Sequence, residues 1–158
     1  MTGFLLDTNV VSELRKRERA NANLRRWLDE QSGAELWLSV LVVGELRRGV
    51  ELIARREKQA ASKLRAWLDS TVKDYADRIL PVTVGICERL ALLSVPDPVP
   101  TVDGLLAATA IEHGLTLVTR NLADVARTGV SVVNPFENAD GRHVTTLARR
   151  GSVVTNER

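Results

Sequence analysis

The sequence has 158 residues, of which 44% are hydrophobic and 27% are charged. These values are typical of a single globular domain, and they exclude a disordered chain and a membrane span. The apolar run near the amino terminus is too short for the core of a signal peptide, so we expect a cytoplasmic protein. The single cysteine, Cys87, excludes an internal disulfide, and we expect it to be a small buried apolar residue.

The charge balance is slightly basic, with a net charge of +2 and a pI of about 9.0. Arginine clusters can contact phosphates through their bidentate guanidinium groups. The same clusters can be the solvated face of amphipathic helices, and for any one cluster this interpretation is favoured. The clusters are Arg15-Lys16-Arg17, Arg25-Arg26, Arg47-Arg48 and Arg55-Arg56.

The first predicted element lies in the stretch from Gly3 to Asn9, a short apolar run that ends in an acid, a hydroxyl and an amide. Such a run, followed at once by helical periodicity, predicts the central strand of a buried parallel sheet. Asp7 is then at the carboxyl end of that strand. In open α/β sheets ligands bind at this edge, because helix amino termini point into the crevice there.

Helices and strands alternate through the first half of the chain. We predict helices from residue 10 to about 17 and from 21 to about 31, the second closed by Gly33, and then a strand at 35–39. Two longer helices, one from residue 40 and one over about 58–76, form a helical hairpin arm. The first arm helix is expected to carry Leu41, Gly44, Glu45, Arg48 and Leu52 on one face.

In the second half an edge strand is expected at 78–82, where Pro81 is tolerated, and a helix at 84–93. The proline-rich stretch 95–100 is a stiff connector, with Thr101 as the N-cap of the next helix, which ends at Gly114. Strands are predicted at 115–119 and 130–133. Between them Asn121 and Asp124 resemble a capping box that opens a short helix.

Strands alternate with helices from end to end, and this pattern predicts an α/β fold with a parallel sheet covered by helices on both faces. Beyond residue 137 the sequence is polar and weakly periodic. We expect this tail, residues 138–158, to be mobile or ordered by a partner.

Four acids stand out: Asp7, Glu45, Asp103 and Asp124. Asp7 and Asp124 follow predicted strands, Asp103 lies in the first turn of a helix, and Glu45 lies in an apolar stretch where an unpaired charge is costly. Each also has a simpler explanation. Asp7 can cap a helix, Asp103 can complement a helix dipole, Asp124 can belong to a capping box, and Glu45 can pair with Arg48.

A shared location would give these acids a common chemistry. Two carboxylates about 4 Å apart repel by about 4 kcal/mol at an effective dielectric of about 20, so an all-acid pocket needs protons or a metal ion. Oxygen ligands without a histidine or cysteine cluster favour Mg²⁺ or Mn²⁺. The two histidines, His113 and His143, form no zinc spacing, and we expect neither to be catalytic.

These residues resemble the motifs of the PIN-domain ribonucleases. The resemblance rests on Asp7-Thr8-Asn9 after an apolar strand, Glu45 in VVGELRRG, Asp103 in PTVDGLLAATA, and Thr119-Arg120-Asn121 followed by Asp124. More narrowly, the chain resembles the VapC-type toxins of toxin-antitoxin pairs, FitB-like subgroup. The resemblance extends from about Gly3 to Glu137, so we expect a PIN-like nuclease domain over residues 1–137.

The resemblance implies a three-layer α/β/α sandwich with a central, mostly parallel sheet of about five strands and a helical hairpin arm. It implies a divalent-metal-dependent endoribonuclease that is the toxin of a type II toxin-antitoxin system. Asp7, Glu45, Asp103 and Asp124 would hold Mg²⁺ or Mn²⁺, and Thr8, Asn9, Thr119 and Asn121 would support them. The implied partners are RNA, a cognate antitoxin and a second copy of the chain, as a homodimer or a dimer of toxin-antitoxin heterodimers, with no membrane.

Two alternatives remain open at this level. A haloacid-dehalogenase-like phosphatase also uses an aspartate after its first strand with Mg²⁺, but it needs a second aspartate two positions later, where this chain has Asn9. A non-catalytic PIN-like module that binds RNA or protein is the other alternative. Degenerate modules of this kind lose acids, whereas this chain keeps all four.

Overall fold

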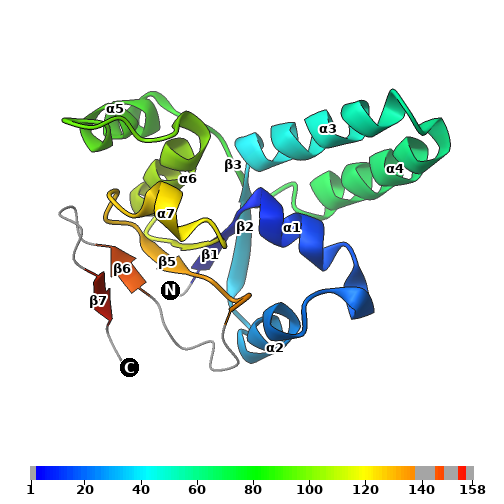
Figure 1. Ribbon diagram of the computed structural model, residues 1–158, viewed down its shortest axis with the longest axis horizontal. Coiled ribbons are helices and arrows are strands. Elements are labelled where there is room, and N and C mark those ends of the chain that lie inside the picture. Colours follow the sequence, from blue (N-terminus) through cyan, green and yellow to red (C-terminus); the bar gives the residue numbers. More distant parts are fainter. Residues whose placement is uncertain (1–2, 138–144, 148–152, 156–158) are drawn as a thin grey trace.

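A computed structural model describes residues 3–137, 145–147 and 153–155 of the chain (Figure 1). Its strands are β1 (Gly3–Leu6), β2 (Glu35–Ser39), β3 (Ile79–Leu80), β4 (Thr116–Val118), β5 (Ser131–Val133), β6 (Thr145–Leu147) and β7 (Val153–Thr155). Its helices are α1 (Thr8–Leu14), α2 (Ala22–Glu30), α3 (Val40–Ala54), α4 (Lys58–Asp74), α5 (Val84–Leu93), α6 (Thr101–Glu112) and α7 (Leu122–Val125), with a 3-10 turn at Arg17–Arg19.

The strands form one sheet in the order β3-β2-β1-β4-β5-β6-β7. The first five strands in this order are parallel, and β6 and β7 extend the sheet in antiparallel pairing. Strand β1 is central, since it pairs with β2 on one side and β4 on the other. The predicted α/β fold with about five parallel strands is confirmed.

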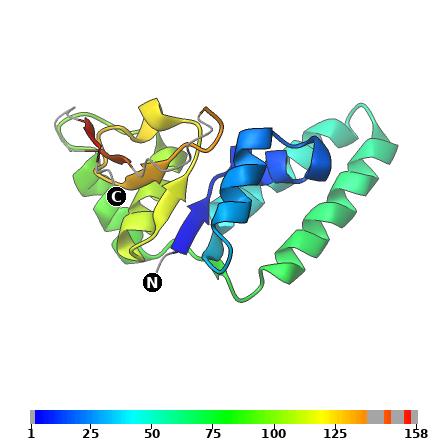
Figure 2. The ribbon, with the colours of Figure 1, turned by 90° about the horizontal axis from the view of Figure 1, so that it is seen from below.

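Helices cover both faces of the sheet, as predicted (Figures 1 and 2). The helices α1 to α4 follow β1 and β2, whereas α5 and α6 connect β3 to β4 across the sheet and lie on the other face. Helices α3 and α4 run antiparallel and project from the body as an arm, shown in cyan and green in Figure 1. This arm is the predicted helical hairpin.

The core lies between the sheet and these helices. The four residues of β1 are all buried, and in β4 Leu117 and Val118 are buried. The rings of Phe4 and Trp27 meet edge to face, with centroids 5.0 Å apart, which joins β1 to α2. On the opposite face a Cβ on Gly104 would lie 2.5 Å from Leu90 Cδ1. The glycine therefore lets α5 approach the amino-terminal turn of α6.

Three local predictions about helix starts need correction. Helix α1 begins at Thr8 rather than at residue 10, because Asp7 caps it. Helix α6 begins at Thr101 itself, with Pro100 in the N-cap position. The predicted capping box is wrong, because Asn121 precedes α7 without a side-chain cap hydrogen bond.

One prediction about burial is also wrong, and a second helix shows which of its faces points inward. Cys87 is exposed, because the inward side of α5 is occupied by Ile86 and Leu93. Helix α3 buries Val42, Leu46 and Val50, so the face predicted to carry Leu41, Gly44, Glu45, Arg48 and Leu52 is not its inward one. Hydrophobic residues fill the whole first turn of this helix, so its periodicity did not identify the inward face.

The tail prediction falls largely outside the described residues. The described parts of 138–158 are the strands β6 and β7, and the division into a domain at 1–137 and a tail stays a prediction. Among the described helices, none combines the length and the apolar character that a membrane crossing requires.

Candidate active site

Asp7 is the buried centre of the site, with 5% of its surface exposed. Its Oδ1 accepts a hydrogen bond from the backbone N–H of Thr8 at 2.6 Å. Its Oδ2 accepts hydrogen bonds from Asn9 Nδ2 at 2.7 Å and from Thr119 Oγ1 at 2.6 Å. Asp7 therefore caps α1, and its carboxylate is held in a fixed orientation at the carboxyl end of β1.

Thr119 is the hub of this hydrogen-bond network. It follows β4 and is 1% exposed. Besides donating to Asp7, its Oγ1 accepts from Asn9 Nδ2 at 3.1 Å and from the backbone N–H of Asn121 at 3.0 Å. The Arg120 backbone N–H lies 3.4 Å from Asn9 Oδ1. The network thus ties the end of β1 to the end of β4, two segments more than a hundred residues apart in sequence.

Glu45 joins the site through Thr8, whose hydroxyl donates a hydrogen bond to Glu45 Oε2. This contact connects α3 to the start of α1. The expectation that Glu45 lies in an apolar environment is wrong, because its side chain is exposed. The alternative pairing with Arg48 is also absent from the ion pairs among the described residues.

Asp103 lies in the first turn of α6 and is half-buried, and Asp124 lies exposed on α7. Burial raises the pKa of Asp103 above its ordinary value, and the charges of Asp124, Asp7 and Glu45 raise it further. Burial also raises the pKa of Asp7, with Glu45 adding to the shift while hydrogen bonds from Thr119, Thr8 and Asn9 oppose it. All four predicted acids therefore act on the same region.

The donor chemistry of this region fits a hard cation, because neighbouring carboxylates that repel one another are stabilised when a cation lies between them. The arrangement of the acids favours an ion that keeps part of its hydration shell. Within the described residues, no group of three or more acidic, histidine or cysteine side chains is arranged to hold a metal. Mg²⁺ keeps several of its waters in proteins, so carboxylates can hold it through them. His113 is exposed at the carboxyl end of α6, and His143 lies outside the described residues.

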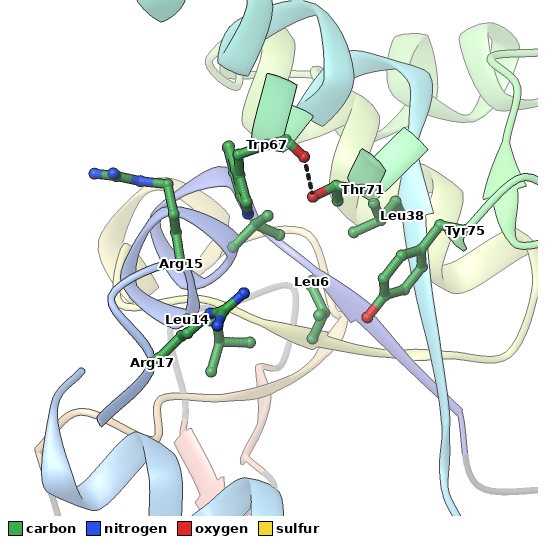
Figure 3. Close-up of a pocket in the computed structure, with 9 residues that line it drawn as sticks. Leu6, Leu14, Arg15, Arg17, Leu38, Trp67, Thr71 and Tyr75 are labelled. Carbon is green, nitrogen blue, oxygen red and sulfur yellow. Dashed lines mark hydrogen bonds between the residues drawn. The ribbon is translucent and has the colours of Figure 1, made fainter. Parts of the chain in front are cut away.

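A pocket of about 180 Å³ lies beside the network, between α1 and α4. Figure 3 shows Leu6 at its centre, with Leu14 and Arg17 on one side and Tyr75 on the other. The Arg15 guanidinium lies 5.8 Å from the centroid of the Trp67 ring. The complete lining is Leu6, Val11, Leu14, Arg15, Arg17, Leu38, Trp67, Thr71 and Tyr75. Sequence inspection missed this pocket, because its walls come from elements that are distant along the chain.

The fold and the site together define an α/β protein with an acidic site at the carboxyl end of its central parallel strand, where the chain connections reverse direction across the sheet. The chain belongs to the PIN-domain family, whose model matches residues 4–129. The predicted resemblance is confirmed.

The alignments with known relatives cover most of this chain and nearly the full length of each relative. The chain is 33% identical to the VapC ribonuclease Y4jK of Sinorhizobium fredii, over 86% of this chain and 99% of that protein. It is also 33% identical to the toxin FitB of Neisseria gonorrhoeae, over 85% of this chain and 99% of FitB. The crystal structure of FitAcB from Neisseria gonorrhoeae aligns with a TM-score of 0.74 at 32% identity, covering 85% of this chain and 99% of that chain.

Proposed function

We propose that the protein is a divalent-metal-dependent endoribonuclease and the toxin of a type II toxin-antitoxin pair. One feature carries the proposal: carboxylates from the end of β1, from α3 and from α7 raise the pKa of the α6 carboxyl group, Asp103, in addition to the effect of its burial. The names of two relatives, a VapC ribonuclease and the toxin FitB, support the same function.

In this proposal Asp7, Glu45, Asp103 and Asp124 hold Mg²⁺ or Mn²⁺, directly or through water. The bound ion would lower the pKa of an attacking water and neutralise charge on the scissile phosphate. The protein's own part is positioning. Thr119 and Asn9 fix the Asp7 carboxylate through hydrogen bonds to Oδ2, and Thr8 orients Glu45. Asn121 contributes its backbone N–H to Thr119.

We further propose that a cognate antitoxin binds the pocket between α1 and α4 with an apolar segment. The pocket offers an aliphatic floor at Leu6 and Leu38 and two aromatic side chains, Trp67 and Tyr75. It begins one residue from Asp7, so a segment seated there would also reach the acids. Solved structures of similar chains include toxin-antitoxin complexes, among them the structure of FitAB bound to the IR36 DNA fragment, with 30% sequence identity to this chain. A homodimer or a dimer of heterodimers is part of the same proposal.

The phosphatase alternative is disfavoured by Asn9. Its Nδ2 donates to Asp7 Oδ2 and to Thr119, and an amide in that position cannot exchange a proton as the required aspartate does. A non-catalytic binding module needs no acid cluster, because a site that only contacts RNA gains nothing from carboxylates that repel phosphates.

The experiment that tests the function is cleavage of single-stranded RNA by the purified chain freed of any antitoxin. We expect cleavage with Mn²⁺ or Mg²⁺ and none with EDTA. Asp7→Asn is nearly isosteric, so it should keep the fold by circular dichroism and lower cleavage at least about 1,000-fold, because it removes a charge at the centre of the site. Asp69→Asn on the arm, where Asp69 is exposed, is the matched control and should cleave like the wild type.

Cleavage that persists in Asp7→Asn would rule out the assigned role of Asp7. Stable occupancy of Asp7 by a phosphoryl group or fluoroberyllate, without RNA cleavage, would favour the phosphatase instead.

A further inference from the structure

Arg120 lies directly beside the acid network and has no role in it beyond its backbone. It stands between Thr119 and Asn121, and its N–H points to Asn9 Oδ1. Its side chain is exposed. The backbone position of Arg120 is therefore as fixed relative to Asp7 as that of Thr119, whereas its guanidinium faces solvent.

The guanidinium has a defined resting place. Its central carbon lies 5.6 Å from the centroid of the Phe136 ring. Phe136 is itself anchored, because its N–H donates to Asn134 Oδ1 at 3.0 Å and its carbonyl oxygen accepts from Asn23 Nδ2 at 3.0 Å. A cation over an aromatic face keeps its outward N–H donors available. The guanidinium thus rests against the ring of a residue whose backbone is held by two hydrogen bonds.

The charge is also not neutralised by an ion pair with any other residue of the described chain. The charge acts on Glu13, whose pKa is lowered mainly by a hydrogen bond from Lys16, with Arg120 adding to the shift. Glu13 is already engaged by Lys16 Nζ at 2.6 Å and by the Asn21 N–H at 2.9 Å. The guanidinium donors therefore stay available for another anion.

The Arg120 guanidinium lies to one side of the acids, where it can contact a phosphate next to the scissile one. The charges that act on Asp103 are carboxylates, while Arg120 acts on Glu13, at the far end of α1 from Asp7. Glu13 follows Asp7 by six positions, which is about 9 Å along the helix axis. A strand of RNA that crosses the acid edge meets a region that repels its backbone, so a cation at the side of this region attracts a neighbouring phosphate.

We propose that Arg120, held against Phe136, binds a backbone phosphate that flanks the cleaved bond of a single-stranded RNA. This inference rests on the proposed ribonuclease function. The contact is charge-assisted and can be bidentate, so it strengthens substrate binding without taking part in the chemical step. Arg120 is a substrate-positioning residue in this scheme.

The test measures binding of a labelled single-stranded RNA in the cleavage-inactive Asp7→Asn background, with and without Arg120→Gln. We expect Arg120→Gln to weaken RNA binding about tenfold. The slope of log affinity against log salt should become shallower by about 0.7, the value for one phosphate contact. The RNA affinity of Arg120→Lys should lie between those of the parent and of Arg120→Gln, because lysine keeps the charge and loses the planar guanidinium. Phe136→Leu should weaken binding about two- to fivefold.

Arg56→Gln, on the exposed tip of the arm, is the control and should bind RNA as its parent does. In the active enzyme Arg120→Gln should raise KM about tenfold and leave kcat within about twofold. Unchanged binding, an unchanged salt slope, or a fall in kcat without a rise in KM would overturn the proposal while leaving the ribonuclease function intact. A wild-type chain that neither binds nor cleaves RNA would overturn both.

Discussion

The acidic edge of the sheet and the α3–α4 arm are held together in different ways. At the edge, buried Asp7 and Thr119 are joined by hydrogen bonds that connect segments far apart in the sequence. On the arm, two neighbouring helices are bridged by exposed ion pairs, Arg47 with Asp69 at 2.7 Å and Arg65 with Glu51 at 2.8 Å. The arm can form from local contacts, whereas the edge needs the complete parallel sheet.

This difference predicts where substitutions matter. A buried polar group that loses its partner costs more than an exposed ion pair that opens to water. The edge should therefore respond strongly to the loss of a single hydroxyl, and the arm should tolerate the loss of a whole charge.

Among the substitutions that test this contrast, the largest effect is expected for Thr119→Val, which keeps the shape of the side chain and removes the hydroxyl. Asp7 Oδ2 then loses one donor, and Asn9 and the Asn121 N–H lose an acceptor. We expect the free energy of unfolding to fall by about 1–3 kcal/mol and RNA cleavage to fall about 10- to 100-fold. Chemical denaturation and initial cleavage rates measure the two effects.

Thr119→Ser keeps the hydroxyl and serves as the control, with cleavage close to that of the wild type. If the valine variant cleaved RNA as fast as the serine variant, the hydroxyl would not position Asp7.

An intermediate effect is expected for Asp103→Asn in the metal-free protein. The folded state raises the pKa of Asp103, so the folded protein binds a proton more tightly than the unfolded chain does. Stability is then lost as the pH rises from the ordinary carboxyl range through the raised pKa. In EDTA at neutral pH the variant should melt a few degrees above the wild type, and near pH 3.5 the difference should disappear.

Added Mn²⁺ should reverse the order at neutral pH, because the ion stabilises the wild type more than the variant. Thermal melts followed by circular dichroism, with EDTA and with Mn²⁺, measure both differences. A wild type that melts above Asp103→Asn in EDTA at neutral pH would contradict the repulsion among the acids.

The smallest effect is expected for Arg65→Gln, which opens an ion pair whose side chains are 43% and 56% exposed. The free energy of unfolding should change by no more than about 1 kcal/mol, and cleavage should be unchanged. A loss of activity comparable to that of Thr119→Val would show that the arm and the edge are coupled.

The same contrast explains what could be predicted from the sequence. The strand at 35–39 and the arm were found because their signals are local: a short run rich in large apolar residues, and helical spacing. The acids were identified as a set, and the structure brings their charges together. The exposure of Glu45 and of Cys87 was missed, because periodicity identifies a helix better than it identifies which side faces inward.

The partners of Asn121 could not be predicted for a different reason. A hydroxyl next to an amide suggested a cap, whereas the Thr119 hydroxyl accepts from the Asn121 backbone and donates to Asp7. Whether Thr119 bonds a local or a distant partner depends on the position of β1 in the folded sheet. Strand β1 lies more than a hundred residues before Thr119, so local sequence patterns do not report on it.

The strand order has a consequence for synthesis on the ribosome. Strand β1 emerges first, but its neighbour β4 is separated from it by about two thirds of the chain. A nascent polypeptide that has reached only the end of α5 carries Asp7 and Glu45 and lacks Asp103, Thr119 and Asp124. The acidic edge is thus completed only late in translation, and a prematurely released fragment would lack half of its acids.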